Sequence, residues 1–156
     1  MEKKAKTNSS FSRELSGGIL RAANEEERTV ELSFSSEEPY ERWFGVEILD
    51  HSDGCVDLER LCSIGCVLFN HKRDEVIAKV LEAKCENGRC TAVIQFDKDE
   101  KSDVIYQKVK GGTLKGVSVG YLVSVWEEVA AGKTSSDGRF TGPCSIAKRW
   151  MPYEIS

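Results

Sequence analysis

The stretch GVSVG places the hydroxyl group of Ser118 between two glycines, Gly116 and Gly120. Glycines beside a nucleophile let a carbonyl group approach it, and they free backbone N–H groups to stabilise an oxyanion. A serine becomes nucleophilic only beside a base, and the two histidines of the chain, His51 and His71, are the candidates. The structural alternative is that these small residues mark a bulge or the close approach of another element.

The two histidines lie in different contexts. His71 ends the apolar run CVLFNH, whereas His51 lies in the turn cluster DHSDG. A lone histidine at the end of a strand is more often a structural polar residue than a catalytic base, so the run by itself favours the structural role for His71. We expect His51 to be structural as well.

A zinc site is the competing chemistry. The chain has six cysteines, and without an export signal we expect reduced thiols. Cys62, Cys66 and His71 form a C-x3-C-x4-H cluster, to which Cys85 and Cys90 could add thiolates. The spacings match no standard zinc finger, so we predict metal-free thiols and no cofactor.

Composition limits the class of protein. The chain has 156 residues, of which 40% are hydrophobic and 31% charged, as expected for one globular domain. The net charge of −4 argues against a nucleic-acid partner, because binding to a phosphate backbone needs a basic face. There is no run of about 18 apolar residues, so no membrane span is expected. No apolar segment follows the N-terminal lysines, so no signal peptide is expected.

The elements that must position Ser118 are mainly strands. Alternation of apolar and polar residues predicts strands over Arg28–Ser36, Arg42–Leu49, Cys66–His71, Leu114–Trp126 and Ala147–Ser156, with a hairpin over Val76–Asp97 that turns at Asn87-Gly88. Helices are predicted over Val56–Cys62 and Asp99–Lys110, the second capped by Asp99. Residues 130–143 are expected to form a loop, and residues 1–27 a flexible N-terminal segment. Residues 28–156 then form one domain, an antiparallel β-barrel or sandwich with one or two helices attached.

Four segments, in this order, resemble the HK97-type phage prohead proteases, the serine proteases of capsid maturation: the strands from Arg28 to His51, VDLERL with VLFNH, LKGVSVGY, and WMPYEIS. The resemblance implies the fold of the herpesvirus assemblins, a closed or nearly closed antiparallel β-barrel flanked by helices, with the nucleophile facing out of the barrel. Prohead proteases continue beyond the EIS segment, so we expect a domain truncated at its C-terminus.

The resemblance also implies residue roles. Ser118 matches the nucleophile and His71 the general base, and we expect them on adjacent strands within hydrogen-bond reach. Glu154 of the EIS segment is the favoured third catalytic member, and Asp97 is the alternative. If Tyr153 and Ile155 pack into the barrel, Glu154 faces outward, on the side of Ser118.

By this resemblance the chain is expected to be a serine endopeptidase of phage prohead maturation. It would act in the cytoplasm of the bacterial host, inside the assembling prohead. Its expected substrates are the major capsid protein, a scaffold protein and the chain itself, with no nucleic-acid or membrane partner and with a dimer or larger oligomer left open. The alternatives are a non-catalytic capsid assembly or scaffolding module and a zinc-binding β-module.

Overall fold

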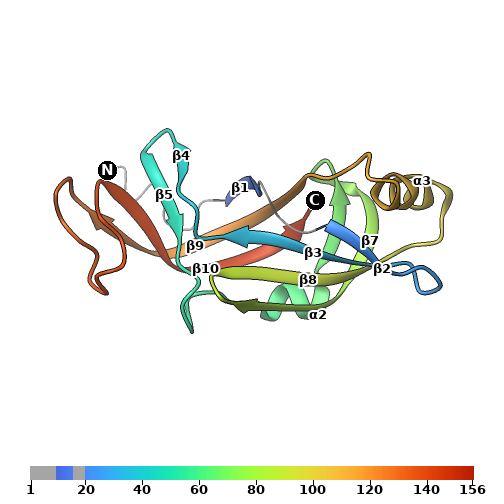
Figure 1. The fold of residues 1–156 in the computed structure, drawn as a ribbon, viewed down its shortest axis with the longest axis horizontal. Helices are drawn as coiled ribbons and strands as arrows, with labels where there is room; N and C mark the ends of the chain where they lie inside the picture. Colours follow the sequence, from blue (N-terminus) through green and yellow to red (C-terminus); the bar gives the residue numbers. More distant parts are fainter. Residues whose placement is uncertain (1–9, 16–19) are drawn as a thin grey trace.

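The structure is a computed structural model that describes residues 10–15 and 20–156 (Figure 1). Its strands are β1 (Ser10–Leu15), β2 (Leu20–Asn24), β3 (Thr29–Ser36), β4 (Tyr40–Arg42), β5 (Gly45–Leu49), β6 (Cys66–Phe69), β7 (Lys72–Glu86), β8 (Arg89–Phe96), β9 (Val117–Val129) and β10 (Cys144–Ile155). Its helices are α2 (Glu59–Ile64) and α3 (Glu100–Lys110). Strands β1 and β2 lie within residues 1–27, where a flexible segment was expected. Residues 1–9 and 16–19 of that expected segment lie outside the described residues.

The strands form one open, mixed sheet, so the prediction of a closed antiparallel barrel is wrong. The order is β1-β9-β10-β6-β7-β8-β3-β2, and β5 joins at β10 and carries β4. Strand β10 pairs in parallel with both β5 and β6, whereas its pairing with β9 is antiparallel. Across the described ranges no backbone ladder joins β1 to β2, so the sheet keeps two free edges. Alternation in a sequence identifies the buried face of each strand, but it does not give the strand's partner or its direction.

The larger of two apolar core clusters among the described residues draws on strands from across the sheet. Phe34 of β3, Ile94 of β8, Val119 of β9 and Trp150 of β10 belong to it, and none is more than 2% exposed. Helix α3 joins this core through Tyr106, whose ring centroid lies 5.4 Å from that of Phe96. The sheet therefore curls far enough for β3 and β8 to share a core with β9 and β10 without closing.

The locally encoded elements agree with the sequence. The hairpin of β7 and β8 turns at Asn87 and Gly88, which have φ of 52° and 74°, as the Asn-Gly pair predicts. Helix α3 begins after Asp99, whose carboxylate accepts a hydrogen bond from the Ser102 backbone N–H at 3.2 Å. The first predicted helix, over residues 56–62, is displaced toward the C-terminus: helix α2 spans Glu59–Ile64.

The expectation of reduced thiols fails at one pair. Cys85 and Cys90 face each other across the β7–β8 hairpin and form a disulfide. Cys62 and Cys66 are free thiols. Within residues 10–15 and 20–156 no group of three or more histidine, cysteine or acidic side chains is arranged to hold a metal ion.

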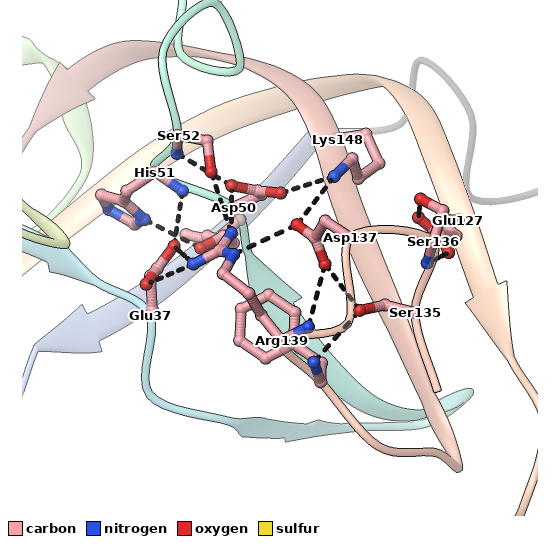
Figure 2. A network of polar contacts seen from close by, with 12 residues as sticks. Glu37, Asp50, His51, Ser52, Glu127, Ser135, Ser136, Asp137, Arg139 and Lys148 are labelled. Atoms are coloured by element: carbon pink, nitrogen blue, oxygen red, sulfur yellow. Dashed lines mark hydrogen bonds and ion pairs between the residues drawn. The ribbon is translucent and has the colours of Figure 1, made fainter. Parts of the chain in front are cut away.

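A network of charges fixes the loop of residues 130–143, which joins β9 to β10 (Figure 2). Arg139 reaches from this loop to Glu37 and to the fully buried Asp50, with its Nη2 2.7 Å from Asp50 Oδ1. Lys148 Nζ binds the other oxygen of Asp50 at 2.7 Å. Burial alone would raise the pKa of Asp50, but hydrogen bonds from Lys148 and Ser52 outweigh it and lower the pKa to about 2.

Candidate reactive site around Ser118

Ser118 is fixed by the pairing of β9 with the end of β10. Its neighbours Val117 and Val119 are buried, so the serine side chain lies on the opposite face of the strand. The backbone N–H of Ser118 donates to the carbonyl oxygen of Ser156 at 2.9 Å, and its carbonyl oxygen accepts from the Ser156 N–H at 2.8 Å. The nucleophile candidate therefore has a backbone that is paired on both its donor and its acceptor.

His71 lies in a tight turn rather than on a strand. Asn70 and His71 connect β6 to β7, and both have φ of 58°, in the left-handed region. Two successive residues of this kind build the two-residue hairpin turn that matches the twist of the strands. The His71 backbone N–H donates to Ser156 Oγ at 2.8 Å. The expectation that Ser118 and His71 lie on adjacent strands is wrong, because β10 runs between β6 and β9.

The structure brings the three expected side chains together. His71 Nε2 lies 2.7 Å from Ser118 Oγ, and His71 Nδ1 lies 2.6 Å from Glu154 Oε1. Since the carboxylate can only accept, the hydrogen at Nδ1 is donated to Glu154, and Nε2 is left to accept the Ser118 proton. The side chain of His71 is 32% exposed and that of Glu154 is 12% exposed. The imidazole is thus held in the tautomer that a general base requires, at the edge of solvent.

A bulge orients Glu154. Simple alternation along β10 would put Glu154 on the same face as Trp150 and Pro152, and Trp150 is only 1% exposed. The register between β10 and β9 shifts between Pro152 and Glu154, which turns the carboxylate toward the Ser118 side. Ile155 is fully buried, as expected for this orientation, whereas Tyr153 is half-buried.

Gly120 makes room for this carboxylate. A Cβ atom at Gly120 would lie 2.6 Å from Glu154 Cγ and 2.8 Å from Glu154 Oε1, closer than van der Waals contact allows. A Cβ atom at Gly116 would meet nothing within 4 Å. The two glycines beside Ser118 therefore differ: Gly120 accommodates the acid of the site, and Gly116 leaves open space.

The other two predicted candidates, Asp97 and His51, have structural roles. Asp97 follows β8 with its N–H bonded to the Ile77 carbonyl oxygen, and the acid beside His71 is Glu154. His51 is buried, donates from Nδ1 to the Leu49 carbonyl oxygen at 2.8 Å and binds the Ser35 hydroxyl through Nε2 at 2.8 Å. Burial lowers the pKa of His51, which favours the neutral form of its ring.

Strand β1 is a part of the site that the sequence interpretation missed. It lies along β9 with Glu14 opposite Ser118, and the carbonyl oxygen of Arg13 lies 3.1 Å from Ser118 Oγ. A serine hydroxyl has one proton, so Arg13 and His71 compete to accept it. The Arg13 side chain is buried, with Nη1 3.3 Å from Glu47 Oε1. The alternation of Phe11, Arg13 and Leu15 was a weak strand signal inside a polar segment.

An apolar cavity of about 380 Å³ adjoins Ser118 and His71. Most of the side chains around it are aliphatic or aromatic, and they come from α3 and from strands β2, β3, β6, β7, β8, β9 and β10. Leu20, Leu32, Ile94 and Val109 are examples. The polar residues that line it are Glu14, Asn70, His71, Ser118 and Ser156.

Comparison with known proteins points away from a protease. The chain is 35% identical over 129 residues to the major capsid protein of Halomonas phage phiHAP-1. This match covers 80% of the chain but only 20% of the relative, so the chain spans about a fifth of the length of the curated protein that it matches. No family model and no solved structure matches the chain.

These findings correct the functional expectations. The similarity is to a structural protein of the phage particle, so the predicted prohead protease, its endopeptidase activity and its capsid and scaffold substrates are contradicted. Within the part of the chain that the structure describes, no helix is long and apolar enough to cross a membrane.

Proposed function

We propose that this chain is a module of a phage capsid polypeptide, with a structural role in building the particle. The observation that carries this proposal is the 35% identity to a phage major capsid protein over 80% of the chain. Because the chain corresponds to 20% of that relative, the proposal concerns a part of such a polypeptide. Its place of action would be the host cytoplasm, where the shell assembles.

Complementation tests the capsid role. The phiHAP-1 major capsid protein would be expressed without the segment that this chain matches, and this chain would be supplied as a separate polypeptide. We expect shells to sediment as particles only when the chain is present, and to contain it. Normal shells without the chain, or shells that exclude it, would refute a structural role for this module.

We also propose that Ser118, His71 and Glu154 form a reactive centre within the module, with Ser118 as nucleophile, His71 as base and Glu154 as the orienting acid. The pair of hydrogen bonds at 2.7 Å and 2.6 Å supports these roles. His71 Nε2 would take the proton as Ser118 Oγ attacks an electrophile, and the negative charge of Glu154 would stabilise the imidazolium.

Covalent labelling tests the reactive centre. A fluorophosphonate probe should modify Ser118 in the intact chain, and the site of modification is read by peptide mass spectrometry. Ser118→Ala and His71→Ala should each lose labelling, and Asp97→Asn should keep it, because His71 binds Glu154 instead. An unlabelled Ser118 in folded protein, or undiminished labelling in His71→Ala, would reject the assignment.

A further inference from the structure

The cavity beside Ser118 suggests what the serine reacts with. It is lined mainly by hydrocarbon side chains, and Ser118 and His71 are among the residues that line it. Its volume of about 380 Å³ falls within the range of small-molecule sites, which combine apolar walls with a few placed polar groups. A group that fills it while its carbonyl carbon meets Ser118 Oγ must itself be apolar.

The groups that contact Ser118 leave its approach past Gly116 open. Glu154 covers Gly120 on one side of Ser118, and the β1 backbone lies against the hydroxyl. At Gly116 a Cβ atom would meet nothing within 4 Å, and this residue both lines the cavity and is exposed to solvent. The open approach to Ser118 therefore passes Gly116 and leads along hydrocarbon.

We infer that the cavity binds the apolar chain of an acyl donor, and that Ser118 is an acylation site for apolar acyl groups. The inference rests on the proposed reactive centre. The donor would be an ester or thioester of an apolar acid. Ser118 Oγ bonds to the carbonyl carbon, the bond from that carbon to the leaving oxygen or sulfur breaks, and the Ser118 proton passes through His71 Nε2 to the leaving alcohol or thiol. The acyl chain then lies in the cavity as an ester of Ser118.

Alkanesulfonyl fluorides of increasing chain length provide the test. Their sulfonyl group stands in for the carbonyl group: Ser118 Oγ bonds to sulfur, fluoride leaves, and His71 takes the proton, so that a stable adduct remains. The measurement is the second-order rate constant for adduct formation on Ser118, read by intact mass and peptide mapping. Each buried methylene should raise this constant about fourfold, so the butane reagent should react roughly 60-fold faster than the methane reagent.

Two aromatic substitutions test whether the dependence of the rate on chain length arises at Gly116. Gly116→Phe puts a ring at the open approach and should reduce the difference between the butane and methane reagents to less than about fivefold, roughly the effect of one buried methylene. Lys115→Phe adds the same ring at the neighbouring exposed position, which does not line the cavity, and should keep the full difference. Gly116→Leu repeats the test with a smaller group if the phenylalanine variant does not fold.

The outcomes separate the two proposals. Equal rates for all chain lengths, with adducts on Ser118, would overturn the apolar site and leave the reactive serine in place. An unchanged chain-length preference in folded Gly116→Phe would also overturn it. Failure of every reagent and of the fluorophosphonate probe to modify Ser118 in folded protein would instead reject the reactive centre itself.

Discussion

Substitution of Gly120 by alanine should disable the reactive centre without changing any of its side chains. The new methyl group would lie 2.6 Å from Glu154 Cγ, whereas non-bonded carbon atoms settle near 3.5–4.0 Å. Glu154 must therefore move by about an ångström, and its 2.6 Å hydrogen bond to His71 Nδ1 would then exceed hydrogen-bond length. The effect reaches Ser118 only through the imidazole.

The magnitude follows from the hydrogen bond that is lost. A hydrogen bond to a charged group contributes about 1.5–3 kcal/mol, and each 1.36 kcal/mol on a barrier is tenfold in rate. The rate constant for fluorophosphonate labelling of Ser118 should thus fall about 10- to 150-fold in Gly120→Ala. Glu154→Gln keeps the shape of the side chain but removes its charge, and should lower the rate by about 10²–10⁴-fold.

Gly116→Ala is the matched control, because the same methyl group meets nothing within 4 Å there. We expect its labelling rate to change less than about threefold, well under the loss of a charged hydrogen bond. Circular dichroism and thermal unfolding establish that each variant is folded. If folded Gly120→Ala labels as fast as the native chain, Glu154 does not orient the base, and the role argued for the glycine is wrong.

The remaining predictions concern stability. Arg139→Gln should lower the free energy of unfolding by about 1–3 kcal/mol in urea titrations, since buried Asp50 loses one of its two cationic partners; no change would mean that the loop is held by other contacts. The pKa of Asp50 is lowered from 3.8 to about 2, so its stabilising effect is present above pH 4 and is lost as the pH falls toward 2, a dependence that Asp50→Asn should weaken. Replacing Cys85 and Cys90 together by serine should cost about 2 kcal/mol, and a reductant should then have no further effect on unfolding.

The juxtaposition of Ser118, His71 and Glu154 was more predictable than the fold around them. Ser118, His71 and Glu154 lie in short motifs that were singled out by their resemblance to a known family, with Asp97 as the alternative to Glu154. The Asn87-Gly88 turn and the Asp99 cap depend on neighbouring residues alone. Local signals of this kind are present in the sequence because a few adjacent side chains determine them.

The features that the sequence did not predict depend on distant pairing. Nothing in β10 indicates that it pairs in parallel with β5 and β6, or that a bulge before Glu154 reverses its face. Strand β1 is polar and short, and it is a strand because β9 offers it an edge. The similarity to a capsid protein was not predicted either, since motifs describe a site and not the polypeptide that carries it.

The position of Ser156 gives the site an order of assembly during synthesis. This residue pairs with the backbone of Ser118, and its hydroxyl accepts from the backbone of His71, while Glu154 two residues earlier supplies the acid. A nascent chain that has completed β6 to β9 holds the serine and the histidine but has nothing to align them. In the proposed reactive centre, the Ser118 hydroxyl would therefore be aligned with His71 and Glu154 only after β10 has been made and has inserted between β6 and β9.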